Sequence, residues 1–143
     1  MATDLDDILG TAALNETERR VVIRILGRLR SEIGPDLLAV WLYGSRARGE
    51  ADPTETDPDL RSDVDLLAIV DSSRDAAELQ RWAQPMVEEE GDAEGDSPVY
   101  YSLRVFDGDW LRGRRQIRSF FIQEVDRDKL ILAGGRLEGE EYQ

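Results

Sequence analysis

The chain has 143 residues and a formal net charge of −13 at pH 7, with 31 acidic and 18 basic residues. So acidic a surface argues against binding to duplex nucleic acid or to an anionic membrane, both of which attract basic proteins. The sequence contains no cysteine and no histidine. This excludes disulfides, imidazole bases and histidine-ligated zinc, so any general base or metal ligand must be a carboxylate.

The length predicts one domain over residues 1–143, large enough to bury a core. No stretch is apolar for long enough to span a membrane, and the chain starts with an acidic segment where a secretory signal would be basic. We therefore expect a cytoplasmic protein.

The first part of the chain predicts helices. Residues 4–9 fit either a short helix or a frayed end, and from Asn15 the order Asn-Glu-Thr-Glu fits a capping box with Glu18 at the third helical position. Gly34-Pro35 ends this helix. An apolar stripe at helical spacing predicts packing against a sheet: Val21, Val22, Ile25, Leu26, Leu29 and Ile33. The arginines of this helix lie mostly off the stripe, which favours a solvated face over a phosphate or RNA contact.

Two apolar strands follow. Residues 37–43 are almost wholly apolar, as in a strand covered on both faces, and they end at Gly44-Ser45. The second strand covers residues 63–70, and its alternation places Asp63 and Asp65 on one face. Two neighbouring carboxylates repel unless a cation lies between them, and hard oxygen ligands suit Mg²⁺ or Mn²⁺. The alternation therefore predicts a metal site at Asp63 and Asp65.

Gly44 and Ser45 provide a complementary phosphate site. A glycine lets a phosphate approach the backbone, and a helix that follows it offers free N–H groups. The Ser45 hydroxyl can cap that helix or bind a phosphate, while Arg46 and Arg48 add positive charge. Alone, Gly-Ser is an ordinary turn and Asp-x-Asp a solvated strand edge. Their order between two apolar strands is what indicates a nucleotide site.

The run GSRARG at residues 44–49, followed by SDVDL at residues 62–66, resembles the signature of the polymerase-β-like nucleotidyltransferase superfamily. The likeness is greatest to its small stand-alone minimal nucleotidyltransferase (MNT-type) domains. It implies a two-layer α/β (α+β) fold, with a mixed twisted sheet of about four strands and helices mainly on one face. It also implies Mg²⁺-dependent transfer of a nucleoside monophosphate, AMP from ATP, to an acceptor hydroxyl. Asp63 and Asp65 would be the catalytic metal ligands, and the nucleotide-binding residues would be Gly44, Ser45, Arg46 and Arg48.

The chain departs from the family pattern in two places. Residues 50–62 are longer than the usual link between the motifs and add four acids near the proposed metal site: Asp52, Glu55, Asp57 and Asp59. Many active members also carry a third carboxylate on the next strand, predicted here over residues 99–106, where Ser102 or Tyr100 stands instead. No base for the acceptor hydroxyl is then evident, unless Glu94, Asp96 or the 50–62 loop supplies one.

The remaining segments complete the predicted sheet. A helix opens at Ser72-Ser73-Arg74-Asp75 with a hydroxyl cap and is kinked or divided at Pro85. After the third strand, Asp107 caps a short helix, Ser119–Asp126 is helical, and residues 130–132 form a last strand. A basic cluster either contacts a triphosphate or RNA or balances the acidic loops: Arg112, Arg114, Arg115 and Arg118.

The acceptor is the open question. The chain has no room for the extra domain of antibiotic-modifying or polymerising relatives. The resemblance therefore implies a protein acceptor, a helical HEPN protein, with this chain as the antitoxin of a toxin–antitoxin pair. One alternative is a degenerate nucleotidyltransferase-fold module that neutralises its partner by contact alone, and the missing third carboxylate favours it. The other is a small-molecule nucleotidyltransferase whose pocket forms in a homodimer.

Overall fold

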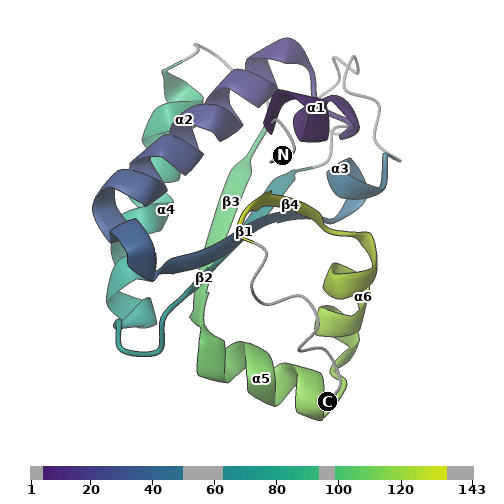
Figure 1. Cartoon of the computed structure of the whole chain (residues 1–143). Helices are drawn as coiled ribbons and strands as arrows, with labels where there is room; N and C mark the ends of the chain where they lie inside the picture. Colours follow the sequence, from purple (N-terminus) through teal and green to yellow (C-terminus); the bar gives the residue numbers. More distant parts are fainter. Residues whose placement is uncertain (1–4, 50–62, 94–98, 135–143) are drawn as a thin grey trace.

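The computed structural model describes residues 5–49, 63–93 and 99–134 (Figure 1). Within them lies a four-stranded sheet of order β3-β2-β1-β4. β1 pairs antiparallel with both β2 and β4, whereas β2 and β3 are parallel. The predicted mixed sheet of four strands is thus confirmed. The strands are β1 (Leu37–Tyr43), β2 (Val64–Val70), β3 (Tyr101–Asp107) and β4 (Leu130–Ala133).

Six α-helices surround the sheet in the described part of the chain: α1 (Leu5–Gly10), α2 (Glu16–Ile33), α3 (Ser45–Arg48), α4 (Ala76–Asp92), α5 (Gly108–Gln116) and α6 (Phe120–Asp128). A 3₁₀ turn, η1 (Gly34–Asp36), joins α2 to β1. None of the described helices combines the length and apolar character needed to cross a bilayer.

The helix ends follow from local capping. The predicted capping box is present: Glu18 N donates to Asn15 Oδ1 at 2.8 Å, and Asn15 N donates to Glu18 Oε1 at 2.9 Å. The cap of α4 is Asp75, whose carboxylate accepts from Glu78 N at 3.1 Å, so the predicted serine cap is wrong. The predicted division of this helix is also wrong, because α4 continues through Pro85. Pro85 lies on the exposed side, where water can replace the backbone hydrogen bond that proline removes.

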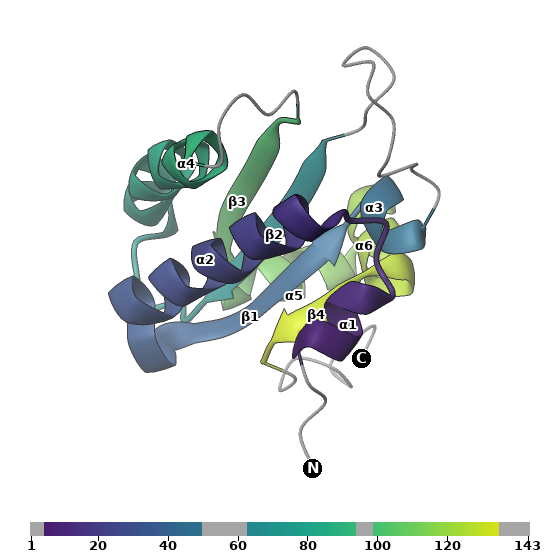
Figure 2. The ribbon, with the colours of Figure 1, turned by 90° about the horizontal axis from the view of Figure 1, so that it is seen from above.

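The helices form two unequal layers (Figure 1). α1, α2 and α4 cover one face, where their apolar side chains meet Val40, Leu42, Leu66 and Leu103 in the larger core. Figure 2 looks onto that layer and shows α5 behind the strands. α5 and α6 form a smaller core on the opposite face, around Trp41. This second layer packs on the Leu67–Ile69 half of β2. The other half of β2 on this face, which begins next to Asp63, belongs to neither core.

Strand β3 is the edge of the sheet beside β2, and α4 occupies its outer side. Gln80 Oε1 accepts from Val105 N at 2.7 Å, and Gln80 Nε2 donates to the Leu103 carbonyl at 2.8 Å. Gln84 repeats the pattern one turn later, accepting from Leu103 N at 3.2 Å and donating to the Tyr101 carbonyl at 3.3 Å. These side chains satisfy backbone groups that an edge strand would otherwise expose, and they hold β3 in place.

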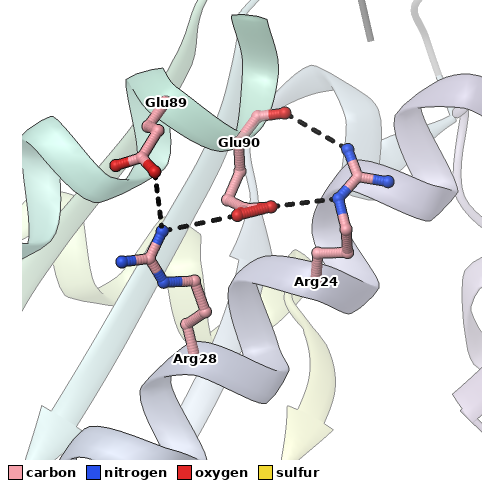
Figure 3. Close-up of polar contacts among 4 residues, drawn as sticks. All are labelled: Arg24, Arg28, Glu89 and Glu90. Carbon is pink, nitrogen blue, oxygen red and sulfur yellow. Dashed lines mark hydrogen bonds and ion pairs between the residues drawn. The ribbon is translucent and has the colours of Figure 1, made fainter. Parts of the chain in front are cut away.

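A charged cluster joins α2 to α4. Figure 3 shows Glu90 of α4 between two arginines of α2. Arg24 Nε donates to Glu90 Oε1 at 3.0 Å, and Arg28 Nη1 donates to Glu90 Oε2 at 3.4 Å. Glu89 makes a longer ion pair with Arg28 Nη1, at 3.7 Å. These two arginines of α2 therefore serve helix packing.

We expect Glu90→Gln to lower the free energy of unfolding by about 1–2 kcal/mol, because Glu90 pairs with two guanidinium groups and its side chain is only 14% exposed. Glu89→Gln is the matched control. That side chain is 73% exposed and makes one long ion pair, so its loss should stay below about 0.5 kcal/mol. Urea unfolding followed by circular dichroism measures both. Equal losses in the two variants would refute the bridging role of Glu90.

Candidate functional site

The turn after β1 brings the two sequence motifs into contact. Gly44 has a φ of 81°, a conformation that side chains disfavour. A Cβ built at this position would lie 3.0 Å from Asp65 Oδ2. Both the backbone conformation and this approach therefore require glycine at position 44. The helix that follows, α3, has only one turn, so its dipole is weak.

Asp65 lies at the centre of the site. It faces Tyr43 across the β1–β2 pair and Ser102 across the β2–β3 pair. Ser102 Oγ donates to Asp65 Oδ1 at 2.9 Å, which leaves Oδ2 toward Gly44. Asp63 is exposed just before β2, two residues earlier along the same strand direction. The structure therefore brings Gly44, Asp65 and Ser102 together, with Asp63 beside them.

The surroundings of Asp65 disfavour its negative charge. Burial raises the pKa of the Asp65 carboxyl, the hydrogen bond from Ser102 opposes that rise, the negative charge of Asp63 adds to it, and the positive charge of Arg46 opposes it. The net effect is a raised pKa. A divalent cation would remove both causes of the rise, because it would compensate the buried charge and the repulsion between the carboxylates.

The donor set suits a hard cation. Asp63 and Asp65 offer carboxylate oxygens, which Mg²⁺ prefers, and Mg²⁺ commonly uses one or two carboxylates and fills its other positions with water and phosphate. No group of three or more acidic side chains able to hold a metal occurs among residues 5–49, 63–93 and 99–134. The residues present thus fit one cation held by two carboxylates.

Of the two residues that stand where the sequence led us to look for a third carboxylate, Ser102 is the one beside Asp65. It is in register with Asp65, whereas Tyr100 precedes β3 and its hydroxyl contacts Gln84 Nε2 at 3.1 Å. The later acid of this strand, Asp107, accepts from Trp110 N at 2.8 Å and caps α5. The other carboxylates considered from the sequence, Glu94, Asp96 and those of residues 50–62, lie outside the described residues.

Arg46 differs from its predicted role as a nucleotide ligand. Its side chain is 0% exposed, and Nη1 donates to Glu18 Oε1 at 2.7 Å and to the Ala13 carbonyl at 2.9 Å. Ala13 N in turn donates to the Arg46 carbonyl at 2.9 Å. A buried guanidinium with these contacts cannot also touch a nucleotide, so Arg46 anchors α3, and with it Gly44, to the turn before α2. The sequence gave no sign of this pairing, because Glu18 is distant along the chain.

Arg48 stays on the surface next to the glycine turn. It lines a pocket of about 160 Å³ together with Tyr43, Gly44, Phe121, Glu124 and Val125. Of the two arginines predicted to bind nucleotide, Arg48 is therefore the one whose side chain lies beside the site and is exposed.

Two further side chains, which the sequence motifs do not indicate, belong to this face. Tyr43 faces Asp65 from β1. Burial raises the pKa of the Tyr43 phenol, Asp65 adds to the rise, and Arg104 opposes it through its charge and a hydrogen bond. Arg104 follows Ser102 by two residues, and that spacing was the available signal, because alternate residues of a strand share a face.

The predicted basic cluster of α5 does not form one anion site. Arg115 is buried against Asp126, Arg112 pairs with Asp109, and the Arg114 guanidinium lies 5.8 Å from the centroid of the Trp110 ring. The cluster also follows Asp107, which is in register with Val70 at the far end of β2 from Asp65. These arginine contacts lie within α5 and α6, the helices of the second layer.

Comparison with known proteins supports the fold. No family model matches the sequence, and no curated protein matches it. A variant of the toxin–antitoxin MntA–HpeT shares 20% identity over 87% of this chain and 76% of its own, with a TM-score of 0.50. A predicted nucleotidyltransferase from Sulfolobus solfataricus shares 19% identity over 92% and 87%, with a TM-score of 0.42. The likeness of TM-score 0.50 confirms a small nucleotidyltransferase-type fold, and at 20% identity it concerns the fold alone.

Proposed function

We propose that the protein binds ATP with Mg²⁺ and transfers AMP to a hydroxyl group of a protein partner. The observation that carries this proposal is the approach of Gly44 to Asp65, where a Cβ would lie 3.0 Å from Oδ2. The bare backbone of the Gly-Ser turn and the carboxylate on β2 are immediate neighbours. A phosphate held at the turn and a cation held by the carboxylate would therefore be neighbours as well.

Each residue then has a defined part. Asp63 and Asp65 would hold Mg²⁺, which supplies charge neutralisation on the phosphates when bound. Ser102 fixes the orientation of Asp65 through Oδ1, and Ser45 and Arg48 would contact phosphate oxygens. Arg46 positions the Gly44 turn without touching substrate. In the transfer, the acceptor oxygen bonds to the α-phosphorus, the bond to the pyrophosphate oxygen breaks, and the acceptor proton passes to solvent.

The proposed partner is a helical HEPN-type toxin, with this chain as the antitoxin. Two observations support a protein partner. The solved structure of TM-score 0.50 is a toxin–antitoxin pair. In addition, Ile117 directly after α5 and Phe120 at the start of α6 are 69% and 87% exposed, and large apolar side chains exposed together are typical of protein contacts.

A second candidate is a non-catalytic module that neutralises its partner by binding. Ser102 favours it, because a hydroxyl replaces the carboxylate expected opposite Asp65. The two candidates differ in turnover: the enzyme releases pyrophosphate in the presence of its partner, and the module does not.

The test is calorimetric titration of the full chain with each NTP, with and without Mg²⁺. We expect Mg²⁺-dependent binding of ATP, and a loss of at least about tenfold in affinity in Asp63→Asn/Asp65→Asn, since that variant lacks the metal ligands. Asp36→Asn/Asp71→Asn is the control. It also removes two acidic charges, but at the end of the β1–β2 pair that lies away from the site, so this variant should bind ATP as the wild type does.

Two outcomes would contradict the proposal. Unchanged affinity in the Asp63/Asp65 variant would refute the site. A wild type that binds no NTP would favour the module.

A further inference from the structure

Arg104 lies on the same face of the sheet as the candidate site. Along β3, Tyr101, Leu103 and Val105 are buried in the larger core, so the alternate residues Ser102 and Arg104 face the other side. Ser102 bonds to Asp65. Arg104 is exposed and in register with Leu67, two residues beyond Asp65 on β2. The guanidinium therefore belongs to the open face next to the carboxylate pair.

Aromatic rings hold this guanidinium in position. Its Cζ lies 5.1 Å from the centroid of the Phe106 ring and 5.8 Å from that of Phe121. Phe106 is itself stacked on Trp110, with the ring centroids 3.6 Å apart, and Phe121 meets Tyr43 edge-on at 5.6 Å. The charge is thus fixed by rings from β3 and α6, which lowers the conformational entropy lost when it binds an anion.

Tyr43 lies near both Asp65 and Arg104. The phenol faces Asp65 across the β1–β2 pair, and the positive charge of Arg104 opposes the rise of its pKa. A guanidinium has five N–H donors, so it can bind a ligand through several of them.

Arg104 also differs from the enclosed cations of the protein. Arg46, Arg115 and Lys129 each pair with a carboxylate. Arg104 has no carboxylate partner among the residues that the structure describes, although acids outnumber bases in the chain by 31 to 18. An exposed guanidinium that lies over aromatic rings, with no acidic partner among the described residues, suits phosphate recognition.

We propose that Arg104 binds the polyphosphate of the nucleotide, on the far side of Asp65 from Gly44 and Ser45, and so makes the site selective for triphosphates. This inference rests on the proposed function of the site. Gly44 and Ser45 would bind one part of the polyphosphate, the cation at Asp63 and Asp65 would lie in the middle, and Arg104 would bind the other part.

The experiment compares Arg104→Gln with Arg114→Gln in the full chain, by calorimetry with ATP, ADP, AMP and adenosine in Mg²⁺. Both variants remove an exposed arginine that lies over one or two aromatic rings, but Arg114 is on α5, beyond the far end of β3. We expect Arg104→Gln to weaken ATP binding by about tenfold or more, AMP binding less and adenosine binding not at all. Arg104→Lys should restore part of the affinity, and Arg114→Gln should bind as the wild type does.

The outcomes separate this inference from the proposed function. Equal ATP affinity in wild type and Arg104→Gln overturns the role of Arg104, while the loss in Asp63→Asn/Asp65→Asn still upholds the site. An equal loss for adenosine and ATP also overturns it, because Arg104 would then stack on the base. If the wild type binds no nucleotide, Mg²⁺ tripolyphosphate is titrated instead. Weaker binding of that anion by Arg104→Gln supports the role, and equal or absent binding overturns it.

Discussion

Replacing Arg46 with methionine is expected to lower the free energy of unfolding by about 3–5 kcal/mol, the usual cost of removing one partner from a buried ion pair. Methionine keeps an unbranched apolar chain in place of the aliphatic part of arginine but removes the charge and the donors. The Glu18 carboxylate, whose side chain is 2% exposed, would then stay buried without its guanidinium. The Ala13 carbonyl would lose the donor that lies 2.9 Å away.

Urea unfolding at pH 7, followed by circular dichroism, measures this loss. Arg48→Met is the matched control, since it removes an exposed arginine from the same helix and should cost less than about 0.5 kcal/mol. Adding Glu18→Gln to Arg46→Met should recover part of the loss, because no unpaired charge stays buried. Similar losses in the Arg46 and Arg48 single variants would show that the ion pair does not anchor α3.

Asp126→Asn should also cost about 3–5 kcal/mol at pH 7, because Asp126 is the common partner of two buried cations. Arg115 Nη2 and Lys129 Nζ lie 2.7 Å and 2.6 Å from Asp126 Oδ1, and all three side chains are buried. Lys129 Nζ also lies 4.3 Å from the centroid of the Trp41 ring. Without the carboxylate, the two cations would repel each other inside the second layer.

The stability that the Asp126 carboxylate contributes decreases as the pH falls. Burial acts to raise the pKa of Asp126, but hydrogen bonds from Arg115 and Lys129 and their positive charges outweigh it and lower the pKa below its ordinary value. A lowered pKa in the folded state stabilises the protein above the unfolded-state pKa of about 3.9, and this contribution is lost as the pH falls through the folded-state pKa. The difference in stability between wild type and Asp126→Asn should therefore be full near neutral pH and shrink below about pH 4.

Asp128→Asn provides the control for this experiment. Asp128 pairs with Arg127 at the surface, two residues from Asp126, so its replacement should have a much smaller effect at pH 7. Thermal unfolding of wild type and both variants at several pH values gives the comparison. A pH-independent difference between wild type and Asp126→Asn would mean that the carboxylate charge contributes little.

The sequence by itself determined the local structure and the identity of the two motifs. The bounds of β1 and the end of β2 agree with the prediction, β2 starts one residue later than predicted, and the capping box at Asn15 and Glu18 forms as predicted. Strand alternation placed Asp63 and Asp65 on one face, and the glycine after β1 indicated a turn with close approach. These features depend on periodicity and on hydrogen bonds between near neighbours, so a single sequence carries them.

Only the tertiary structure decided which side chains meet at the site. The register of β3 places Ser102 against Asp65, and the fold buries Arg46 on Glu18 and leaves Arg104 on the open face. These contacts join segments that are far apart in the chain, and no local pattern specifies the register between strands or the partner of a buried charge. Arg46, within the sequence motif, therefore anchors α3, and Arg104 of β3 is the arginine at the proposed phosphate site.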